Sequence, residues 1–380
     1  MRVLIIGAGT GGLILANTLA RKLSTSTEII LIEKSKNHYF QPGFTLLCFR
    51  LISEEFISRP VKYLLSKRVK LIQGEVKTLN PLTKEVTLSS SESIDYDKLV
   101  ISTGAELDWE KIPGISEGLY KGNIYEFYTL SGAKKLKEEI PRLKGGTIVS
   151  AIGGIPIKCP AAPIKFILLL EDYLRKKGLR EKFKLIFITP AGQVLGRSPY
   201  AEKLENICKE RNIQVIKNFQ IKEVDVVKRK IKGEEEIFYD YLIFTPPHTI
   251  HKAFLEIPDF CDETGFIKVD SHRLQHKLYR DIFALGDVAS LPTAKTASGT
   301  RLQAKVLAKK LSVFTGSKTE DSTIYDGEIL CPVMTRFGKI MFSRYNYEKS
   351  LSPPKESRLN WMLHVWLGKY LYWQIFLKGF

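Results

Sequence analysis

Short apolar runs alternate with segments of helical periodicity along the first 300 residues of the chain. Residues 2–6 (RVLII) and 28–33 (EIILIE) have the β-branched, apolar character of buried parallel strands, and residues 13–23 between them place apolar side chains at helical spacing. Two parallel strands need a long crossover connection, which is usually a helix. The start of the chain therefore predicts a βαβ unit.

The same alternation returns further along the chain. After the strand-like segments VKLIQGEV, EVTLSS and YDKLVIST, a second series begins at residues 145–154 (GGTIVSAIGG), and helices are expected at 162–178 and 200–211. A last long helix is expected over 297–311. Strands that alternate with helices are typical of α/β folds with a parallel sheet. We predict two tandem Rossmann-like domains of three layers each.

Charge and cysteine count narrow the classes of function. The 380 residues include 58 Lys and Arg against 41 Asp and Glu, a formal charge of +17, which favours an anionic partner such as a nucleic acid, a polyanionic cofactor or a membrane surface. No nucleic-acid recognition motif accompanies this charge, so we predict no nucleic-acid partner. The five cysteines lie far apart without a CxxC pair or a Cys/His cluster, which argues against a metal site and a dense disulfide framework.

A glycine motif in the first unit points to a dinucleotide. GAGTGG supplies Gly7, Gly9 and Gly12 directly after a strand and before a helix, and Glu33 ends the next strand. The glycines allow a tight turn, close approach to a pyrophosphate and close helix packing, while Glu33 is expected to accept from ribose hydroxyls, with Lys34 beside it in the same site. The alternative, a glycine turn without a ligand, is the weaker interpretation because strand, helix and acid all stand in the expected order.

Two further motifs favour FAD over NAD. RDIFALGDVA ends in Gly286-Asp287 and resembles the second signature of flavoproteins with two dinucleotide-binding domains, where the aspartate binds the ribityl chain. YDKLVISTGA resembles their connecting motif and brings in Thr103 and Gly104. Three motifs in this order predict FAD as the cofactor, and the alternative for Asp287 is a plain helix cap.

The second unit lacks the features of a nicotinamide site. Its strand is followed by GGIPIKCPAAP, whose prolines remove backbone donors where a helix N-terminus would receive a pyrophosphate. The next strand ends in Thr189-Pro190 in place of a carboxylate. Electrons are therefore expected to reach the flavin from a donor other than NADH.

Three segments of the second half resemble the sulfide:quinone oxidoreductase family. KCPAAPIK (158–165) matches the family's K-C-x-G-A-P-x-K, and CPVMTRFGKIMF (331–342) matches the segment with its last cysteine. LPTAKTASGTRLQAKVLAKKL matches the family's lysine-threonine stretch, which implies Lys295 and Thr296 at the isoalloxazine and its pyrophosphate end. The resemblance implies a disulfide-reductase-type fold and an FAD enzyme that oxidises sulfide to sulfur or polysulfide, with membrane quinone as electron acceptor.

The resemblance also implies a catalytic pair, Cys159 and Cys331. Sulfide is expected to open their bridge, leave one cysteine as a persulfide and free the other, which we predict to be Cys331, to pass two electrons to the flavin. Lys158 is expected to lower a thiolate pKa. The alternative is that both cysteines are merely buried apolar residues. Tyr128 stands where the family has a third cysteine, so FAD is not tethered through that position.

The last 22 residues, 359–380, are unusually apolar and aromatic, and Gly368 is expected to divide them into two short helices. Residues 331–380 hold eight Lys and Arg against two Asp and Glu. This combination predicts monotopic attachment to an anionic membrane surface, with Phe337 as a wall of the quinone site. A core or dimer helix is the alternative.

The predicted organisation has four segments: the first part of the FAD-binding domain (1–110), the second Rossmann-like domain (111–270), the second part of the FAD-binding domain (271–315) and a quinone and membrane-interface region (316–380). The start of the chain shows no signal-peptide pattern, which predicts a peripheral protein on the cytoplasmic side of the cell membrane, open to homo-oligomer formation. Two other functions stay open: a sulfide or persulfide dehydrogenase that serves a cytochrome or partner subunit, and a non-catalytic flavin-bearing subunit.

Overall fold

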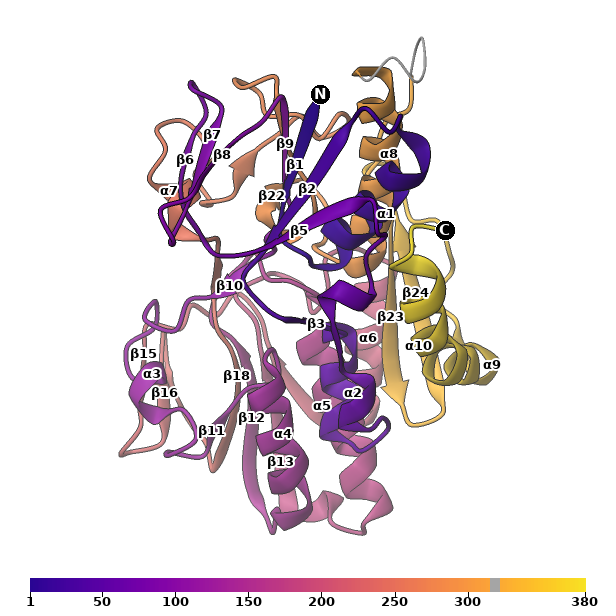
Figure 1. Ribbon diagram of the computed structural model, residues 1–380. Helices are drawn as coiled ribbons and strands as arrows, with labels where there is room; N and C mark the ends of the chain where they lie inside the picture. The colour runs from indigo at the N-terminus through magenta and orange to yellow at the C-terminus, as the bar shows by residue number, and fades with distance from the viewer. Residues whose placement is uncertain (315–321) are drawn as a thin grey trace.

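Two five-stranded sheets form the framework of the computed structural model, which describes residues 1–314 and 322–380 (Figure 1). The first sheet has the order β21-β9-β1-β2-β5 and the second the order β11-β18-β12-β13-β14, and every pairing in both sheets is parallel. The predicted α/β class with two parallel-sheet units is confirmed.

The first sheet is buried on both faces. Along β1, Val3 and Ile5 belong to one apolar cluster and Leu4 and Ile6 to another, because successive side chains of a strand point to opposite faces. Helices cover one face and an antiparallel ribbon covers the other. The strands are β21 (Ile282–Ala284), β9 (Lys98–Ile101), β1 (Arg2–Ile6), β2 (Glu28–Glu33) and β5 (Val69–Gln73), the helices α1 (Thr10–Lys22) and α8 (Ala297–Phe314), and the ribbon β6 (Val76–Asn80), β7 (Glu85–Leu88) and β8 (Ser93–Asp95).

The second sheet, in the lower half of Figure 1, repeats this plan. Ser150 and Ile152 of β12 face its helices, and Val149 and Ala151 face its own antiparallel ribbon. The strands are β11 (Ile124–Tyr125), β18 (Tyr241–Thr245), β12 (Gly146–Ile152), β13 (Phe183–Ile188) and β14 (Ile213–Ile216), the helices α4 (Leu130–Glu139), α5 (Ala162–Lys176) and α6 (Tyr200–Glu210), and the ribbon β15 (Glu223–Asp225), β16 (Lys230–Lys232) and β17 (Glu236–Phe238).

Three of the four helices predicted from the sequence begin at the predicted residue, and the last residues of all four differ from the prediction by one to three positions. α5 and α6 begin at the predicted residues, whereas α1 begins at Thr10, three residues before the predicted start, because the glycine motif itself enters the helix. Shorter elements connect the layers: β3 (Asn37–Tyr39), α2 (Phe44–Cys48), β4 (Ser58–Pro60), β10 (Glu106–Leu107), α3 (Ile115–Gly118), β19 (His248–Thr249), α7 (Lys252–Leu255), β20 (Ile267–Lys268) and β22 (Ala289–Ser290).

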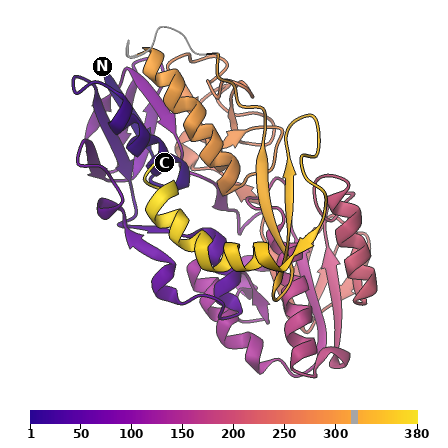
Figure 2. The same ribbon diagram turned by 90° about the vertical axis from the view of Figure 1, so that its right-hand side faces the viewer.

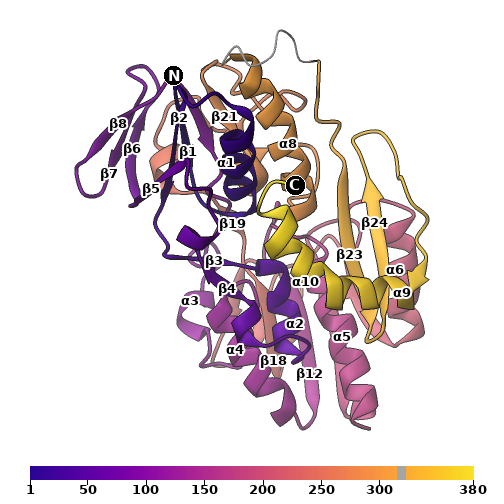
Figure 3. The same cartoon turned by 45° about the vertical axis from the view of Figure 1, so that its right-hand side comes forward.

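The C-terminal segment crosses the junction between the two sheets. It starts as the hairpin β23 (Ile329–Arg336) and β24 (Lys339–Tyr345), pairs through β25 (Glu356–Ser357), and ends in a helical stretch that Figures 2 and 3 show running from this hairpin toward α1. The stretch comprises α9 (Arg358–Met362), α10 (Gly368–Leu371) and two turns of π-helix, Leu363–Leu367 and Tyr372–Phe376.

The predicted break at Gly368 is wrong. Its backbone has φ −56° and ψ −37°, so the chain continues as a helix through this position. Within the described residues, no helix combines the length and apolarity that a bilayer crossing requires. The predicted segment boundary at residues 315 and 316 lies outside the described residues, and the boundaries near residues 110 and 270 stay predictions.

Candidate functional site

The glycine loop after β1 is built so closely that two of its positions admit no side chain. Gly7 has φ +97°, and a Cβ there would lie 2.7 Å from the carbonyl oxygen of Ser102. A Cβ on Gly12 would lie 1.9 Å from the carbonyl oxygen of Gly7. Gly9 caps α1 without a side-chain hydrogen bond. The loop thus leaves the N–H groups at the start of α1 accessible to an anion.

Glu33 ends β2 directly beside this loop. Its Oε2 accepts from the N–H of Ala8 at 2.5 Å and its Oε1 from the N–H of Ser35 at 2.7 Å. Lys34 instead forms ion pairs with Glu75 and Glu106, each at 3.2 Å. Both predicted residues line one pocket together with Gly7 and Thr103. Glu33 therefore lies at the glycine loop with both carboxylate oxygens bonded to backbone N–H groups, and its contact with a ribose stays a prediction, while Lys34 is paired with two carboxylates.

The residues present fit an FAD molecule at this edge of the first sheet. The Thr103 hydroxyl is buried and, among the described residues, has no hydrogen-bond partner, so it needs one from a ligand or water. Gly104 and Gly286 have φ +75° and +76°. The Asp287 carboxyl is buried, which raises its pKa. These groups follow the ends of β9 and β21, which are neighbouring strands of the first sheet, and the space beside Gly104 is open.

Lys295 and Thr296, also predicted at the cofactor, have structural contacts as well. The Lys295 ammonium donates to the backbone carbonyls of Asp287 at 2.7 Å and Ala289 at 2.8 Å, and burial lowers its pKa to about 8. Thr296 Oγ1 accepts from the N–H of Gly299 at 3.1 Å in the first turn of α8. Lys295 therefore brings positive charge to Asp287, whereas Thr296 caps a helix.

The loop after β12 carries Cys159 to the same edge. Cys159 has φ +48°, and its N–H donates to the carbonyl of Lys295 at 2.7 Å, which ties the second unit to the predicted flavin site of the first. Its own carbonyl accepts from the N–H of Ala162, the first residue of α5, at 2.7 Å. The thiol thus stands at a helix N-terminus, where a negative charge is stabilised.

Cys331 on β23 faces Cys159. Interaction with the Cys331 thiol is the main cause that lowers the pKa of Cys159 to about 6, while the pKa of Cys331 rises well above its usual value. Lys165 Nζ lies 3.4 Å from Cys159 Sγ and also lowers the pKa of Cys159. Burial alone would lower the pKa of Lys165, but the charge of Cys159 raises it. Of the two thiols, Cys159 is therefore the one that ionises first.

Sequence reasoning placed the cationic partner at Lys158 and missed Lys165. Burial lowers the pKa of Lys158, and its strongest charge attraction is to Asp287, ahead of Cys159. Lys165 lies six residues after Cys159, one turn into α5, and is itself almost fully buried. The spacing of Cys159 and Lys165 within KCPAAPIK, at the start of a predicted helix, could have identified Lys165 from the sequence. Cys331 was predicted as the flavin-adjacent thiolate, which stays a prediction, although the ammonium lies at Cys159.

The other three cysteines, of which Cys48 and Cys208 are buried and Cys261 is half-buried, all have raised pKa values. Burial raises the pKa of Cys208 to about 12 and that of Cys261 to about 11, and it raises the pKa of Cys48 as well. None of them has a lysine at hydrogen-bond distance in the described chain. Their reactivity is therefore expected to be low.

Phe337 lies at the turn of the β23–β24 hairpin. Its ring contacts Phe49 at 5.8 Å and Trp361 at 6.5 Å, and the Lys176 ammonium lies 4.4 Å from the ring centre. Six residues separate it from Cys331 along the strand, which corresponds to about 20 Å. Phe337 as a wall of the quinone site therefore stays a prediction.

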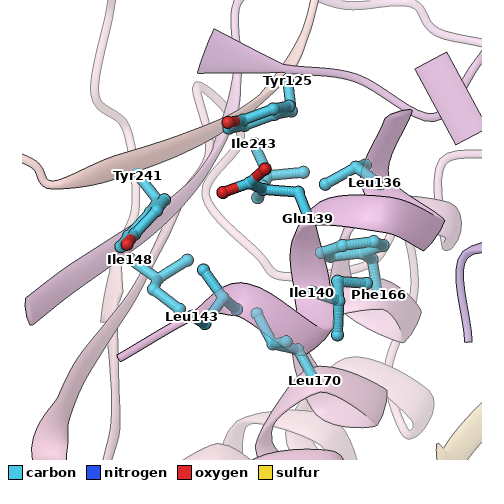
Figure 4. A pocket seen from close by; sticks show the side chains of 10 residues that line it. All are labelled: Tyr125, Leu136, Glu139, Ile140, Leu143, Ile148, Phe166, Leu170, Tyr241 and Ile243. Atoms are coloured by element: carbon cyan, nitrogen blue, oxygen red, sulfur yellow. The ribbon is translucent and has the colours of Figure 1, made fainter. Parts of the chain in front are cut away.

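A separate pocket lies between the second sheet and its helices α4 and α5 (Figure 4). Its lining is mostly aliphatic, with Phe166 on one side and Glu139 between the two tyrosines Tyr125 and Tyr241. It contains no cysteine and none of the predicted site residues. We interpret it as a packing defect of the apolar core.

Known proteins resemble the chain over its full length. The family model for pyridine nucleotide-disulphide oxidoreductases matches residues 1–301. The mitochondrial sulfide:quinone oxidoreductase of Dictyostelium discoideum is 32% identical over 399 aligned positions, which cover 100% of this chain and 86% of that protein, and its mouse counterpart is 29% identical with the same coverage. The solved structure of the sulfide:quinone oxidoreductase from Aquifex aeolicus has the same fold, with a TM-score of 0.84 at 24% identity over 100% of this chain and 92% of that one.

Proposed function

This chain belongs to the sulfide:quinone oxidoreductase family, as its sequence predicted, and we propose that it oxidises sulfide and passes the two electrons to a membrane quinone. The observation that carries this proposal is the meeting of Cys159, Cys331 and Lys165 beside the predicted FAD site of the first unit. Sulfur exchange requires a pair of thiols of which one is easily ionised, and Cys159 has the lowered pKa.

Sulfur exchange begins from the oxidised pair. Hydrosulfide attacks the sulfur of Cys331, a new S–S bond forms there, and the bond between the two cysteines breaks. Cys159 leaves as a thiolate beside Lys165, and Cys331 carries –S–SH; no electrons leave the sulfur atoms in this step. We assign the leaving role to Cys159, in place of Cys331 as predicted from the sequence, because the thiol with the lower pKa leaves faster.

The cofactor of this chemistry is FAD. The glycine loop with Gly7 and Gly12 is expected to hold its pyrophosphate, Glu33 its ribose, and Thr103 and Asp287 the remaining polar groups. When bound, FAD accepts two electrons from the sulfur pair and delivers them to the quinone. Lys158 and Lys295 supply positive charge around Asp287.

Serine variants of the pair test this function. We expect the purified protein to be yellow and to be bleached by sulfide but not by NADH. Cys159→Ser and Cys331→Ser should each lower the rate of sulfide-driven flavin bleaching by about a thousandfold or more, because the exchanging sulfur is gone. Bleaching by dithionite should be unchanged, and Cys208→Ser is the matched control. A normal sulfide rate in both variants would refute the mechanism.

The acceptor is measured in the same preparation. Reoxidation of the sulfide-bleached protein by a short-chain quinone is expected to be faster than reoxidation by a soluble cytochrome c. The reverse order would favour the sulfide dehydrogenase alternative.

The C-terminal helical stretch is the proposed membrane contact. One side packs on the protein through Trp361, Val365, Tyr372, Trp373 and Leu377. The other side exposes large apolar side chains, among them Leu359 at 64%, Met362 at 58% and Trp366 at 69% of their surface. An exposed apolar face beside Lys369 and Lys378 suits the interface of an anionic bilayer.

Peripheral attachment to a membrane follows from this proposal, whereas the side of the membrane and a homo-oligomer stay predictions. Replacing Leu359, Met362 and Trp366 together by Ser should reduce co-sedimentation with anionic liposomes while leaving sulfide bleaching intact. If the triple variant sediments with liposomes as the wild type does, this face does not bind the membrane.

A further inference from the structure

Cys331 lies on an edge strand, and the residue before it is held by a side chain from outside the sheet. β23 is the first strand of the sheet β23-β24-β25, so within the described chain one of its edges has no strand beside it. At that edge the Leu330 N–H donates to Ser298 Oγ at 2.8 Å, and the Ser298 hydroxyl donates to the Leu330 carbonyl at 2.7 Å. One hydroxyl therefore satisfies both backbone groups of Leu330, as a neighbouring strand would do.

Ser298 belongs to the unit that is predicted to hold the flavin. It follows Ala297, the first residue of α8, and its Oγ lies 3.3 Å from Thr296 Oγ1. α8 packs along α1, the helix that follows the glycine loop. The two hydrogen bonds to Leu330 thus join the strand of Cys331 to the first turn of a helix in the flavin unit.

This first turn also approaches β23 closely at the next residue. A Cβ on Gly299 would lie 2.9 Å from Ile329 Cγ2 and 3.1 Å from the Tyr325 hydroxyl. Any larger residue at this position would therefore push β23 away from the helix. Ser298 and Gly299 together fix the distance between α8 and the start of β23.

The same segment holds the other cysteine. The Lys295 carbonyl accepts from the Cys159 N–H at 2.7 Å, and Lys158 and Lys295 pair as in a parallel β-bridge. Residues 295–298 therefore bond to the backbone of Cys159 at one end and to the residue before Cys331 at the other. Neither contact uses a sulfur atom, so the segment sets where the two thiols lie and leaves both free to react.

The far end of β23 is tied to the second unit. The Phe337 N–H donates to Asp172 Oδ2 of α5 at 2.9 Å, and Arg211 Nη1 donates to the Thr335 carbonyl at 2.5 Å. Six residues of extended strand separate Phe337 from Cys331, which corresponds to about 20 Å. These bonds are therefore remote from the thiol, and the contact with Ser298 is the one beside it.

We propose that Ser298 is a positioning residue for sulfur exchange, because its two bonds to Leu330 hold Cys331 in place opposite Cys159. The inference rests on the proposed function, in which the two thiols alternate between a bridged and an open state. A bridge forms only when the sulfur atoms are held at bonding distance, and a misplacement of about 1 Å can slow a reaction by about a hundredfold. Ser298 acts on this geometry through the backbone of β23.

The test is Ser298→Ala, with Ser298→Thr as the variant that keeps the hydroxyl and Ser352→Ala as the control. Ser352 Oγ donates to a carbonyl of the same hairpin, that of Phe342 at 3.1 Å, but lies outside the segment 295–298. Each protein is equilibrated with reduced and oxidised glutathione, and the fraction of Cys159 bridged to Cys331 is measured by mass spectrometry. In Ser298→Ala the equilibrium constant of bridge formation should fall about tenfold, and sulfide-driven bleaching should slow by a similar factor. Ser298→Thr and Ser352→Ala should stay within about twofold of the wild type.

A second variant decides the question if Ser298→Ala loses its fold or its flavin. Gly299→Ala keeps the Ser298 hydroxyl but places a methyl group against Ile329, so its bridging constant should fall about threefold. A wild-type constant in folded Ser298→Ala or in Gly299→Ala, or an equal fall in Ser352→Ala, would overturn the inference. The glutathione equilibrium needs neither sulfide nor quinone. Wild-type protein that sulfide does not bleach would therefore contradict the proposed function, while the bridging constants would still decide whether Ser298 positions Cys331.

Discussion

The two sheets place different chemistry at equivalent positions. β1 and β12 are each the middle strand of a five-stranded parallel sheet, and each runs through a loop into a helix, α1 or α5. After β1 the loop is a glycine turn that presents backbone N–H groups. After β12 the loop presents the side chain of Cys159 at a left-handed backbone position. A helix N-terminus that stabilises a phosphate in one unit stabilises a thiolate in the other.

The loop after β12 also contacts the first unit, at the segment between β22 and α8. The Cys159 N–H donates to the Lys295 carbonyl, and Lys295 in turn holds the backbone around Asp287. Cys159 is therefore linked to the predicted flavin site through Lys295, which accepts from Cys159 and donates to the backbone of Asp287. The comparison teaches that the fold keeps a repeated strand–loop–helix plan while the loop residues decide whether it binds a cofactor or reacts.

The largest expected effect comes from adding one methyl group to each loop. Gly12→Ala would put a Cβ 1.9 Å from a backbone oxygen, which cannot be relieved by a side-chain rotation, so we expect loss of bound FAD and of at least about 3 kcal/mol of unfolding free energy. At Gly154 the nearest atom, on Pro247, is 3.1 Å away, so Gly154→Ala should cost less than about 1 kcal/mol and keep FAD. The measurements are the flavin absorbance per protein and the thermal midpoint. Equal losses of FAD and of stability in both variants would contradict the view that only the loop after β1 binds the cofactor.

An intermediate effect is expected from the two lysines beside Cys159. In Lys165→Met the loss of the ammonium should raise the pKa of Cys159, about 6 in the wild type, by about one to two units. The thiolate is present above its pKa, so at pH 7 the alkylation rate of Cys159 should fall by about two- to tenfold and recover at higher pH.

Lys158→Met is the matched control for this experiment. Its main charge partner is Asp287, so the alkylation midpoint should stay within about 0.5 unit while FAD binding weakens. A larger shift in Lys158→Met than in Lys165→Met would restore the assignment made from the sequence.

Those lysines mark the limit of sequence-based prediction in this chain. Strand runs, the glycine spacing and the Gly-Asp motif could be interpreted because each depends on residues close in sequence. The choice between Lys158 and Lys165 depends on the positive φ of Cys159, which turns the chain so that the thiol faces the residue six positions later. Gly368 was expected to end a helix from its propensity, but packing of the neighbouring Val365 and Tyr372 holds it in helical geometry.

A contact between the first loop and the C-terminal helix lay beyond the sequence entirely, because the two segments are more than 350 residues apart. Tyr372 Oη shares hydrogen bonds with Thr10 Oγ1 at 2.8 Å and His38 Nε2 at 2.7 Å, and His38 Nδ1 bonds to the carbonyl of Ala8 at 2.8 Å. Burial lowers the pKa of His38 to about 4, so the ring is neutral and relays hydrogen bonds without charge. The helix proposed to lie on the membrane thus supports the loop proposed to hold FAD.

The smallest expected effect tests this support. Tyr372→Phe removes the hydroxyl from Thr10 and His38 and should weaken FAD binding by about three- to tenfold, since a neutral hydrogen bond contributes about 1 kcal/mol. The exposed Tyr370→Phe is the control, with no change expected. FAD titration by fluorescence measures both. The Cys159 alkylation midpoint should be constant in both variants, because the tail hydroxyl bonds only around the first loop; a shift in Tyr372→Phe would mean that the two loops respond as one unit.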